Sequence, residues 1–139
     1  MTVQCFIDTN VLIYAATAMN EFPAKHKIAN DIIHGQRFCM SAQVLQEFYV
    51  AVQKKPREPL SRVQAAEWVG WLQPFCEVVV DGFLVDQAIK ASSRHQISYW
   101  DGAIVAAAAR ISAPILYTED LNHGQTYGSV KVINPFRPA

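Results

Sequence analysis

The sequence has little charge, few cysteines and no long apolar run. Only 17% of its 139 residues are charged, and twelve Lys and Arg balance twelve Asp and Glu. A neutral chain has no excess charge with which to hold a long polyanion, so any contact with nucleic acid must rest on local patches. The three cysteines, Cys5, Cys39 and Cys76, lie far apart without a C-x-x-C pair. This spacing argues against a disulfide framework or a zinc knuckle and favours a reducing cytoplasm.

No segment predicts an association with a membrane. The longest apolar run covers residues 103–109 and is much shorter than a membrane-spanning helix. The first residues lack a basic segment, and Asp8 interrupts the stretch that could otherwise form the apolar part of a secretory signal. We therefore expect a soluble cytoplasmic protein with no membrane contact.

The sequence does contain a regular alternation of short β-rich runs and longer helical patterns. Half of the residues (51%) are hydrophobic, and the length suits a single domain over residues 1–139. The patterns predict strands at 3–7, 37–40, 75–80, 115–117 and 130–133, and helices at 11–16, 23–34, 42–53, 62–72, 82–94 and 99–111. Strands that alternate with helices form a parallel sheet covered on both faces. We expect an α/β fold, a three-layer α/β/α sandwich around a mostly parallel sheet of four to five strands, in which the valine-rich run 75–80 is buried on both faces.

Acidic residues of four segments fall where the strands of this sheet end, which is where such sheets bind ligands. Asp8 directly follows the first predicted strand, a position that equally suits a helix cap. Glu47 borders the apolar stripe of helix 42–53, where a solvated boundary position is the better interpretation for it alone. Asp101 occupies a capping-box position but shares its helix face with apolar residues. Glu119 and Asp120 follow the fourth predicted strand.

Taken together, these acids predict a cation site. Carboxylates brought close together repel one another, which raises their pKa values and costs stability. A divalent cation removes this penalty, and ligands that are all oxygen favour Mg²⁺ or Mn²⁺ over zinc.

Four segments, taken in order, resemble the motifs of PIN-domain ribonucleases. They are residues 6–15 (FIDTNVLIYA), 41–48 (SAQVLQEF), 99–108 (YWDGAIVAAA) and 116–121 (LYTEDL). Their order and spacing agree with this family over nearly the whole chain. The resemblance implies a Mg²⁺- or Mn²⁺-dependent endoribonuclease, most often the VapC toxin of a toxin–antitoxin pair. It also implies a cognate antitoxin that docks near the third and fourth helices, and a homodimer.

The resemblance assigns roles to individual residues. By motif, the acids that bind metal and catalyse hydrolysis are Asp8, Glu47, Asp101 and Asp120. Asn10 and Thr118 match polar positions that orient the acids or the waters of the metal, and Glu119 is an additional acid at a variable position. We expect Asp8 and Asp101 to be the principal ligands of one or two cations in a metal-assisted hydrolysis.

RNA must reach these acids although the molecule is neutral. The basic residues nearest the motifs could form a phosphate-guiding patch, and a solvated surface is at least as good an interpretation for any one of them. Two aromatic residues that flank Asp101 could stack on an unpaired base, although core packing suits at least one of them. These candidate RNA-binding residues are Lys54, Lys55, Arg57, Arg62, Tyr99 and Trp100.

Other classes of protein remain open at this point. A response-regulator phosphoacceptor fits poorly, because Asp8 is a single acid and Lys131 lies within the last predicted strand. A haloacid-dehalogenase phosphatase needs a second Asp two residues after the first, where this chain has Asn10. A PIN-like module that binds RNA or a partner protein without cutting is a stronger alternative, and a housekeeping RNA-processing nuclease is another.

Overall fold

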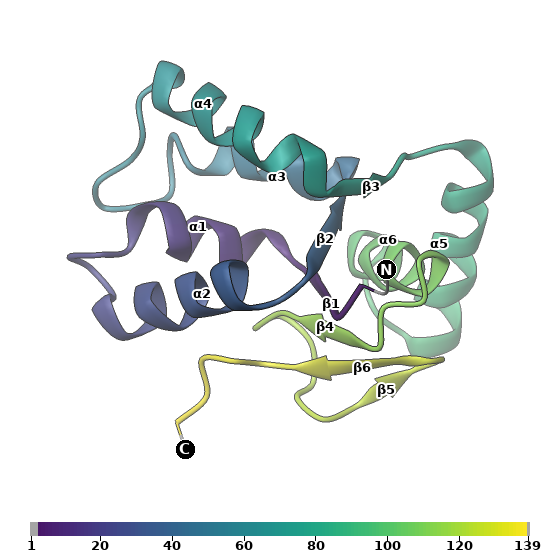
Figure 1. The fold of residues 1–139 in the computed structure, drawn as a ribbon. Helices are drawn as coiled ribbons and strands as arrows, with labels where there is room; N and C mark the ends of the chain where they lie inside the picture. Colours follow the sequence, from purple (N-terminus) through teal and green to yellow (C-terminus); the bar gives the residue numbers. More distant parts are fainter. Residues whose placement is uncertain (1–2, 139) are drawn as a thin grey trace.

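The computed structural model describes residues 3–138 and contains a six-stranded sheet (Figure 1). Its strands are β1 (Cys5–Ile7), β2 (Phe38–Ser41), β3 (Cys76–Val78), β4 (Ile115–Tyr117), β5 (Thr126–Tyr127) and β6 (Val130–Ile133). They are arranged in the order β3-β2-β1-β4-β6-β5, and all neighbours are parallel except β5 and β6. The α/β fold with a mostly parallel sheet is therefore confirmed.

Helices connect the parallel strands. They are α1 (Thr9–Thr17), α2 (Pro23–Gly35), α3 (Ala42–Ala51), α4 (Arg62–Leu72), α5 (Gly82–His95) and α6 (Tyr99–Arg110), with a short 3₁₀ turn at Gln73–Phe75. From β1 the chain moves through β2 to β3 in one direction, and from β3 it returns past β1 to β4 in the other. Because such crossovers are right-handed, α1 to α4 lie on one side of the sheet and α5 and α6 on the other (Figure 1).

Short polar side chains fix where several helices begin. The side chains of Ser41, Ser61, Asp81 and Ser98 each accept a backbone hydrogen bond in the first turn of the helix that follows. These caps set the start of α3 and α6, and with it the positions of Glu47 and Asp101.

The close packing of α5 on α6 depends on one glycine. A Cβ atom on Gly102 would lie 2.7 Å from the carbonyl oxygen of Ala88 and 2.9 Å from the backbone nitrogen of Ser92. Residues 102–108 of α6 are all buried. Gly102 thus lets α6 approach α5 closely and fixes the helix that carries Asp101.

Two sequence-based expectations about the strands are wrong. The sheet has six strands rather than four to five, because the two-residue strand β5 has too little pattern to be recognised before it pairs with β6. The run 75–80 is not a strand buried on both faces: β3 spans only Cys76–Val78 at one edge of the sheet, and Val79 and Val80 are 67% and 50% exposed. The valines of this run indicate β structure, but they do not indicate that β3 pairs with one strand only.

None of the helices described between residues 3 and 138 combines the length and apolar character needed to cross a bilayer.

Candidate active site

The site lies at the carboxyl ends of β1 and β4. The strand order of the sheet reverses between these two strands. These strands pair in parallel, with Phe6 opposite Leu116 and Ile7 opposite Tyr117. The residues that follow them, Asp8 and Thr118, are both buried. In an open α/β sheet this position is the usual place for a ligand.

Asp8 is held by two donors. Its Oδ1 accepts a hydrogen bond of 2.7 Å from the backbone nitrogen of Thr9, and its Oδ2 accepts one of 2.8 Å from the hydroxyl of Thr118. The first bond makes Asp8 the cap of α1. Asp8 thus both caps the helix and faces the site. From the sequence alone, the cap and the site residue could have been two different residues.

Thr118 and Asn10 connect Asp8 to Asp120. The hydroxyl of Thr118 accepts a hydrogen bond of 3.1 Å from the backbone nitrogen of Asp120, while Nδ2 of Asn10 donates to Oδ2 of Asp120 at 3.1 Å. The other side-chain oxygen of Asn10, Oδ1, is buried and has no hydrogen-bond partner among residues 3–138. This acceptor at the site is available to a ligand that carries a donor, such as water.

Glu47 projects from α3 toward α1. Its Oε1 accepts hydrogen bonds of 3.4 Å from the hydroxyl of Thr9 and 3.3 Å from Nε2 of Gln43. Glu47 is exposed at the border of the apolar stripe, as the solvated interpretation expected, yet it still lines the same cavity as Asp8.

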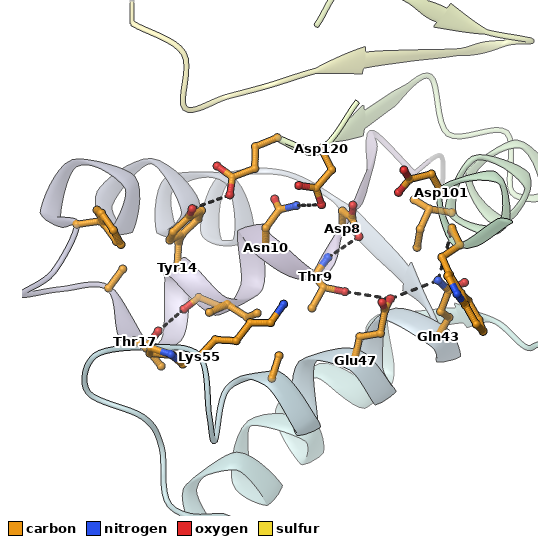
Figure 2. Close-up of a pocket in the computed structure, with 18 of the residues that line it drawn as sticks. Asp8, Thr9, Asn10, Tyr14, Thr17, Gln43, Glu47, Lys55, Asp101 and Asp120 are labelled. Atoms are coloured by element: carbon orange, nitrogen blue, oxygen red, sulfur yellow. Dashed lines mark hydrogen bonds between the residues drawn. The ribbon is translucent and has the colours of Figure 1, made fainter. Parts of the chain in front are cut away.

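Asp101 lies in the first turn of α6, on the other side of the sheet from Glu47. Its backbone nitrogen donates to the hydroxyl of Ser98 at 3.0 Å, and its residue is half-buried. Figure 2 shows its carboxylate on the side of the cavity where Asp8 and Asp120 lie.

All four predicted acids line one cavity of about 320 Å³ (Figure 2). Helix α1 forms one wall with Asn10, Ile13, Tyr14 and Thr17, and α3 and the segment after it form the opposite wall with Glu47, Ala51, Lys55 and Pro56. The cavity extends well past the acids, so a molecule much larger than a hydrated ion fits in it.

Burial, with a further contribution from neighbouring charges, raises the pKa values of three of these acids. Burial raises the pKa of Asp8 to about 7, and the charges of Asp120 and Glu47 add to this, while the bonds from Thr118 and Thr9 oppose it. Partial desolvation at the cavity wall also raises the pKa values of Glu47 and Asp101, with a further increase at Glu47 from Asp101 and at Asp101 from Asp120. A group of carboxylates with raised pKa values is the electrostatic signature of a cation or proton site.

The donor set fits a hard divalent cation. It consists of carboxylate, amide and hydroxyl oxygens, which are the ligands that Mg²⁺ and Mn²⁺ prefer. As their side chains stand, no three acidic, histidine or cysteine side chains within residues 3–138 are close enough together to hold one ion. The four acids therefore face one cavity without forming a finished ligand shell.

The other predicted residues divide between the cavity and its surroundings. Of the candidate RNA-binding residues, Lys55 and Trp100 line the cavity, and Trp100 is 64% exposed. Tyr99 packs against the core and lines a neighbouring hollow. The residues Lys54, Arg57 and Arg62 are exposed and lie outside the cavity wall.

Gln43 and Tyr14 are among the polar residues of this cavity that sequence reasoning missed. Gln43 donates to Glu47, and Tyr14 donates to Glu119. Helical spacing could have indicated both, because Gln43 precedes Glu47 by four residues and Tyr14 follows Asn10 by four.

A family model described as the PIN domain matches residues 5–128 of the chain. The chain belongs to the PIN-domain family. The matched segment contains all four acids, and members of this family are in general dependent on a divalent metal.

Solved structures share this PIN fold. VapC20 of Mycobacterium tuberculosis, described as a toxin that cleaves the sarcin–ricin loop, is 22% identical, with a TM-score of 0.66 over 84% of this chain and 89% of that one. A toxin–antitoxin complex from Klebsiella pneumoniae gives 16% identity and a TM-score of 0.70 over 96% of this chain and 99% of that one. VapBC2 of Rickettsia felis, bound to a promoter DNA fragment, gives 14% and 0.60 over 92% and 96%. No curated protein matched the chain.

Proposed function

We propose that this PIN-domain protein is a Mg²⁺- or Mn²⁺-dependent endoribonuclease and the toxin of a toxin–antitoxin pair. The observation that carries the proposal is that Asp8, Glu47, Asp101 and Asp120 come from four separate segments and line one cavity. The fold shared with VapC-type toxins supports it. Membership of the PIN family argues against the phosphoacceptor and dehalogenase alternatives.

The residues of the site have different proposed roles in hydrolysis. Asp8 and Asp101 are the proposed principal ligands, and Glu47 and Asp120 complete the group. When bound, a divalent cation lowers the pKa of a bound water and offsets the charge that develops on the phosphate. Thr118 and the backbone of Thr9 hold both oxygens of Asp8 in place. Asn10 orients Asp120 and offers its free Oδ1 to a water.

RNA would enter along Lys55 and Trp100, two exposed residues of the cavity wall. Lys55 supplies a positive charge near Glu47, whose pKa it lowers. Trp100 offers an exposed indole on which an unpaired base can stack. The expected substrate is therefore a single-stranded or looped segment of RNA.

The proposed protein partners are an antitoxin and a second copy of the chain. Trp71 on α4 is 44% exposed and packs edge-to-face on Trp68. Trp68 is half-buried against the core, so Trp71 is the exposed member of the pair, and an exposed tryptophan of this kind suits a partner surface. Purification of the chain with the product of a short neighbouring reading frame would test the antitoxin, and the molar mass in solution would test the dimer.

The test of the proposed function is cleavage of RNA. The chain should generate new 5′ ends in single-stranded or looped RNA when Mg²⁺ or Mn²⁺ is present, and none in EDTA. Asp101→Asn should fold normally and lose this activity, because it removes one acid from the cavity. Binding of RNA without new ends would favour the non-cleaving module, and full activity of Asp101→Asn would contradict the assignment of the site.

A further inference from the structure

The carboxylate of Glu119 is held by side chains from α1 and α2. The hydroxyl of Tyr14 donates a hydrogen bond of 2.6 Å to its Oε1, and Nζ of Lys25 lies 3.3 Å from its Oε2. Lys25 also donates to the hydroxyl of Tyr14 at 3.1 Å. The three polar groups therefore form a closed ring of hydrogen bonds at the end of the cavity that lies beyond Asp120.

Aromatic rings enclose the ammonium group of Lys25. Its Nζ lies 4.7 Å from the ring centre of Tyr14, 5.3 Å from that of Phe22 and 5.7 Å from that of Phe136. The faces of aromatic rings attract a cation. The bond to Tyr14 raises the pKa of Lys25, so its charge persists at neutral pH. Glu119 therefore has a permanent positive partner.

Glu119 and Asp120 are adjacent in sequence, but different donors hold them. Nδ2 of Asn10 binds Asp120, and the ring of Tyr14 and Lys25 binds Glu119. Both acids border the cavity, so a released Glu119 would add its charge to the acid group. The sequence alone leaves it open whether one or both of these acids act with Asp8.

We propose that Tyr14 and Lys25 are positioning residues that hold Glu119 out of the metal-binding group, so that Asp120, and not its neighbour Glu119, joins the other three acids. This inference rests on the proposed function. Without Lys25, the charge of Glu119 would be unpaired beside the cavity, and the more negative potential would bind a cation more tightly. The freed carboxylate would also compete with Asp120, so turnover would fall while metal affinity rises.

Titration of the full chain with Mn²⁺ in a calorimeter tests this, with Lys25→Met as the first variant. Methionine keeps an unbranched apolar stem between the aromatic rings. Lys25→Met should bind Mn²⁺ about threefold to tenfold more tightly, as expected from one nearby charge in partly exposed surroundings. Glu119→Gln should stay within about twofold of the original chain, and Lys25→Met combined with Glu119→Gln should return to the same value.

Several results of these Mn²⁺ titrations would overturn the inference. Unchanged Mn²⁺ affinity in Lys25→Met would overturn the inference, as would a double variant that keeps the tighter binding. A loss in Glu119→Gln as large as that in Asp120→Asn would also overturn it. If Lys25→Met does not fold, Tyr14→Phe tests the same point, because it removes the donor but keeps the ring. An original chain that binds no Mn²⁺ would contradict the proposed function and this inference together.

Discussion

The hydroxyl of Thr118 donates a hydrogen bond of 2.8 Å to Oδ2 of Asp8, although 110 positions separate the two residues in the sequence. The same hydroxyl accepts bonds from the backbone of Asp120 and from Asn10. One threonine at the end of β4 therefore connects the first acid of the chain to the last. Because strands β1 and β4 are adjacent and parallel, this connection follows directly from the sheet order.

Replacement of Thr118 should damage activity through Asp8. Thr118→Val keeps the shape of the side chain and removes the donor, which leaves Oδ2 of Asp8 without this bond and raises the pKa of Asp8 further. We expect kcat/KM for RNA cleavage to fall about tenfold to a hundredfold, as for other residues that orient metal ligands. Thr118→Ser keeps the hydroxyl and should retain most of the activity. Equal losses in the two variants would show that the hydroxyl is not the reason.

The raised pKa of Asp8 predicts an unusual dependence of stability on pH. Burial raises this pKa from 3.8 to about 7, so between about pH 4 and pH 7 the folded chain holds a proton that the unfolded chain has released. The free energy of unfolding in EDTA should therefore decrease as the pH rises through this window. Asp8→Asn cannot ionise and should flatten this slope and raise the melting temperature at pH 7.5. Parallel slopes for the two proteins would contradict the assignment to Asp8.

Alanine should have opposite effects on stability at two glycines, because Gly102 lies at the contact of α6 with α5 and Gly70 of α4 does not. In Gly102→Ala the new Cβ would lie 2.7 Å from the backbone oxygen of Ala88, so we expect a loss of about 1–3 kcal/mol in the free energy of unfolding. Activity should also fall, because Asp101 is the adjacent residue. Gly70→Ala in α4 is the control: apart from its chain neighbours and the local helix backbone, no atom lies within 4 Å of its new Cβ, and stability should rise by about 0.5–1 kcal/mol. Urea denaturation measures both changes.

Variants of two adjacent lysines distinguish a specific contact with the RNA phosphate from a general effect of surface charge. Lys55 lines the cavity and Lys54 does not. Lys55→Met should raise the KM for RNA and reduce the salt dependence of binding by about one unit of log–log slope. Lys54→Met should change neither by more than about twofold, because its charge is solvated. Equal effects of the two variants would indicate a diffuse charge effect instead.

Local sequence patterns were sufficient to predict most of the fold. The order of the helices follows from their apolar periodicity and from caps such as Ser41 and Ser98. Strand β5 was missed because two residues give no alternation, and its pairing with β6 is decided by the turn between them. The exposure of Val79 and Val80 could not be predicted either, since it depends on which strand ends at the edge of the sheet.

The position of the site was predictable to a similar degree. Asp8 and Asp120 follow adjacent parallel strands, so the rule that ligands bind at the carboxyl ends of such strands predicts that they lie at one edge of the sheet. What the sequence did not reveal is how Glu119 is held apart from its neighbour. The position of the Glu119 side chain depends on Lys25, which Phe136 helps to hold. Both residues lie outside the sequence motif of Glu119 and come together with it only in the folded protein.

Asp8, Glu47, Asp101 and Asp120 are proposed to form one binding site for a divalent cation. The most direct measurement is the affinity of the purified chain for Mn²⁺, compared with that of a variant that carries both Asp8→Asn and Asp101→Asn. The original chain should bind one or two Mn²⁺ ions, and the double variant, still folded, should bind them at least about tenfold more weakly. A folded original chain that binds neither Mn²⁺ nor Mg²⁺, or a double variant with unchanged affinity, would contradict this proposal.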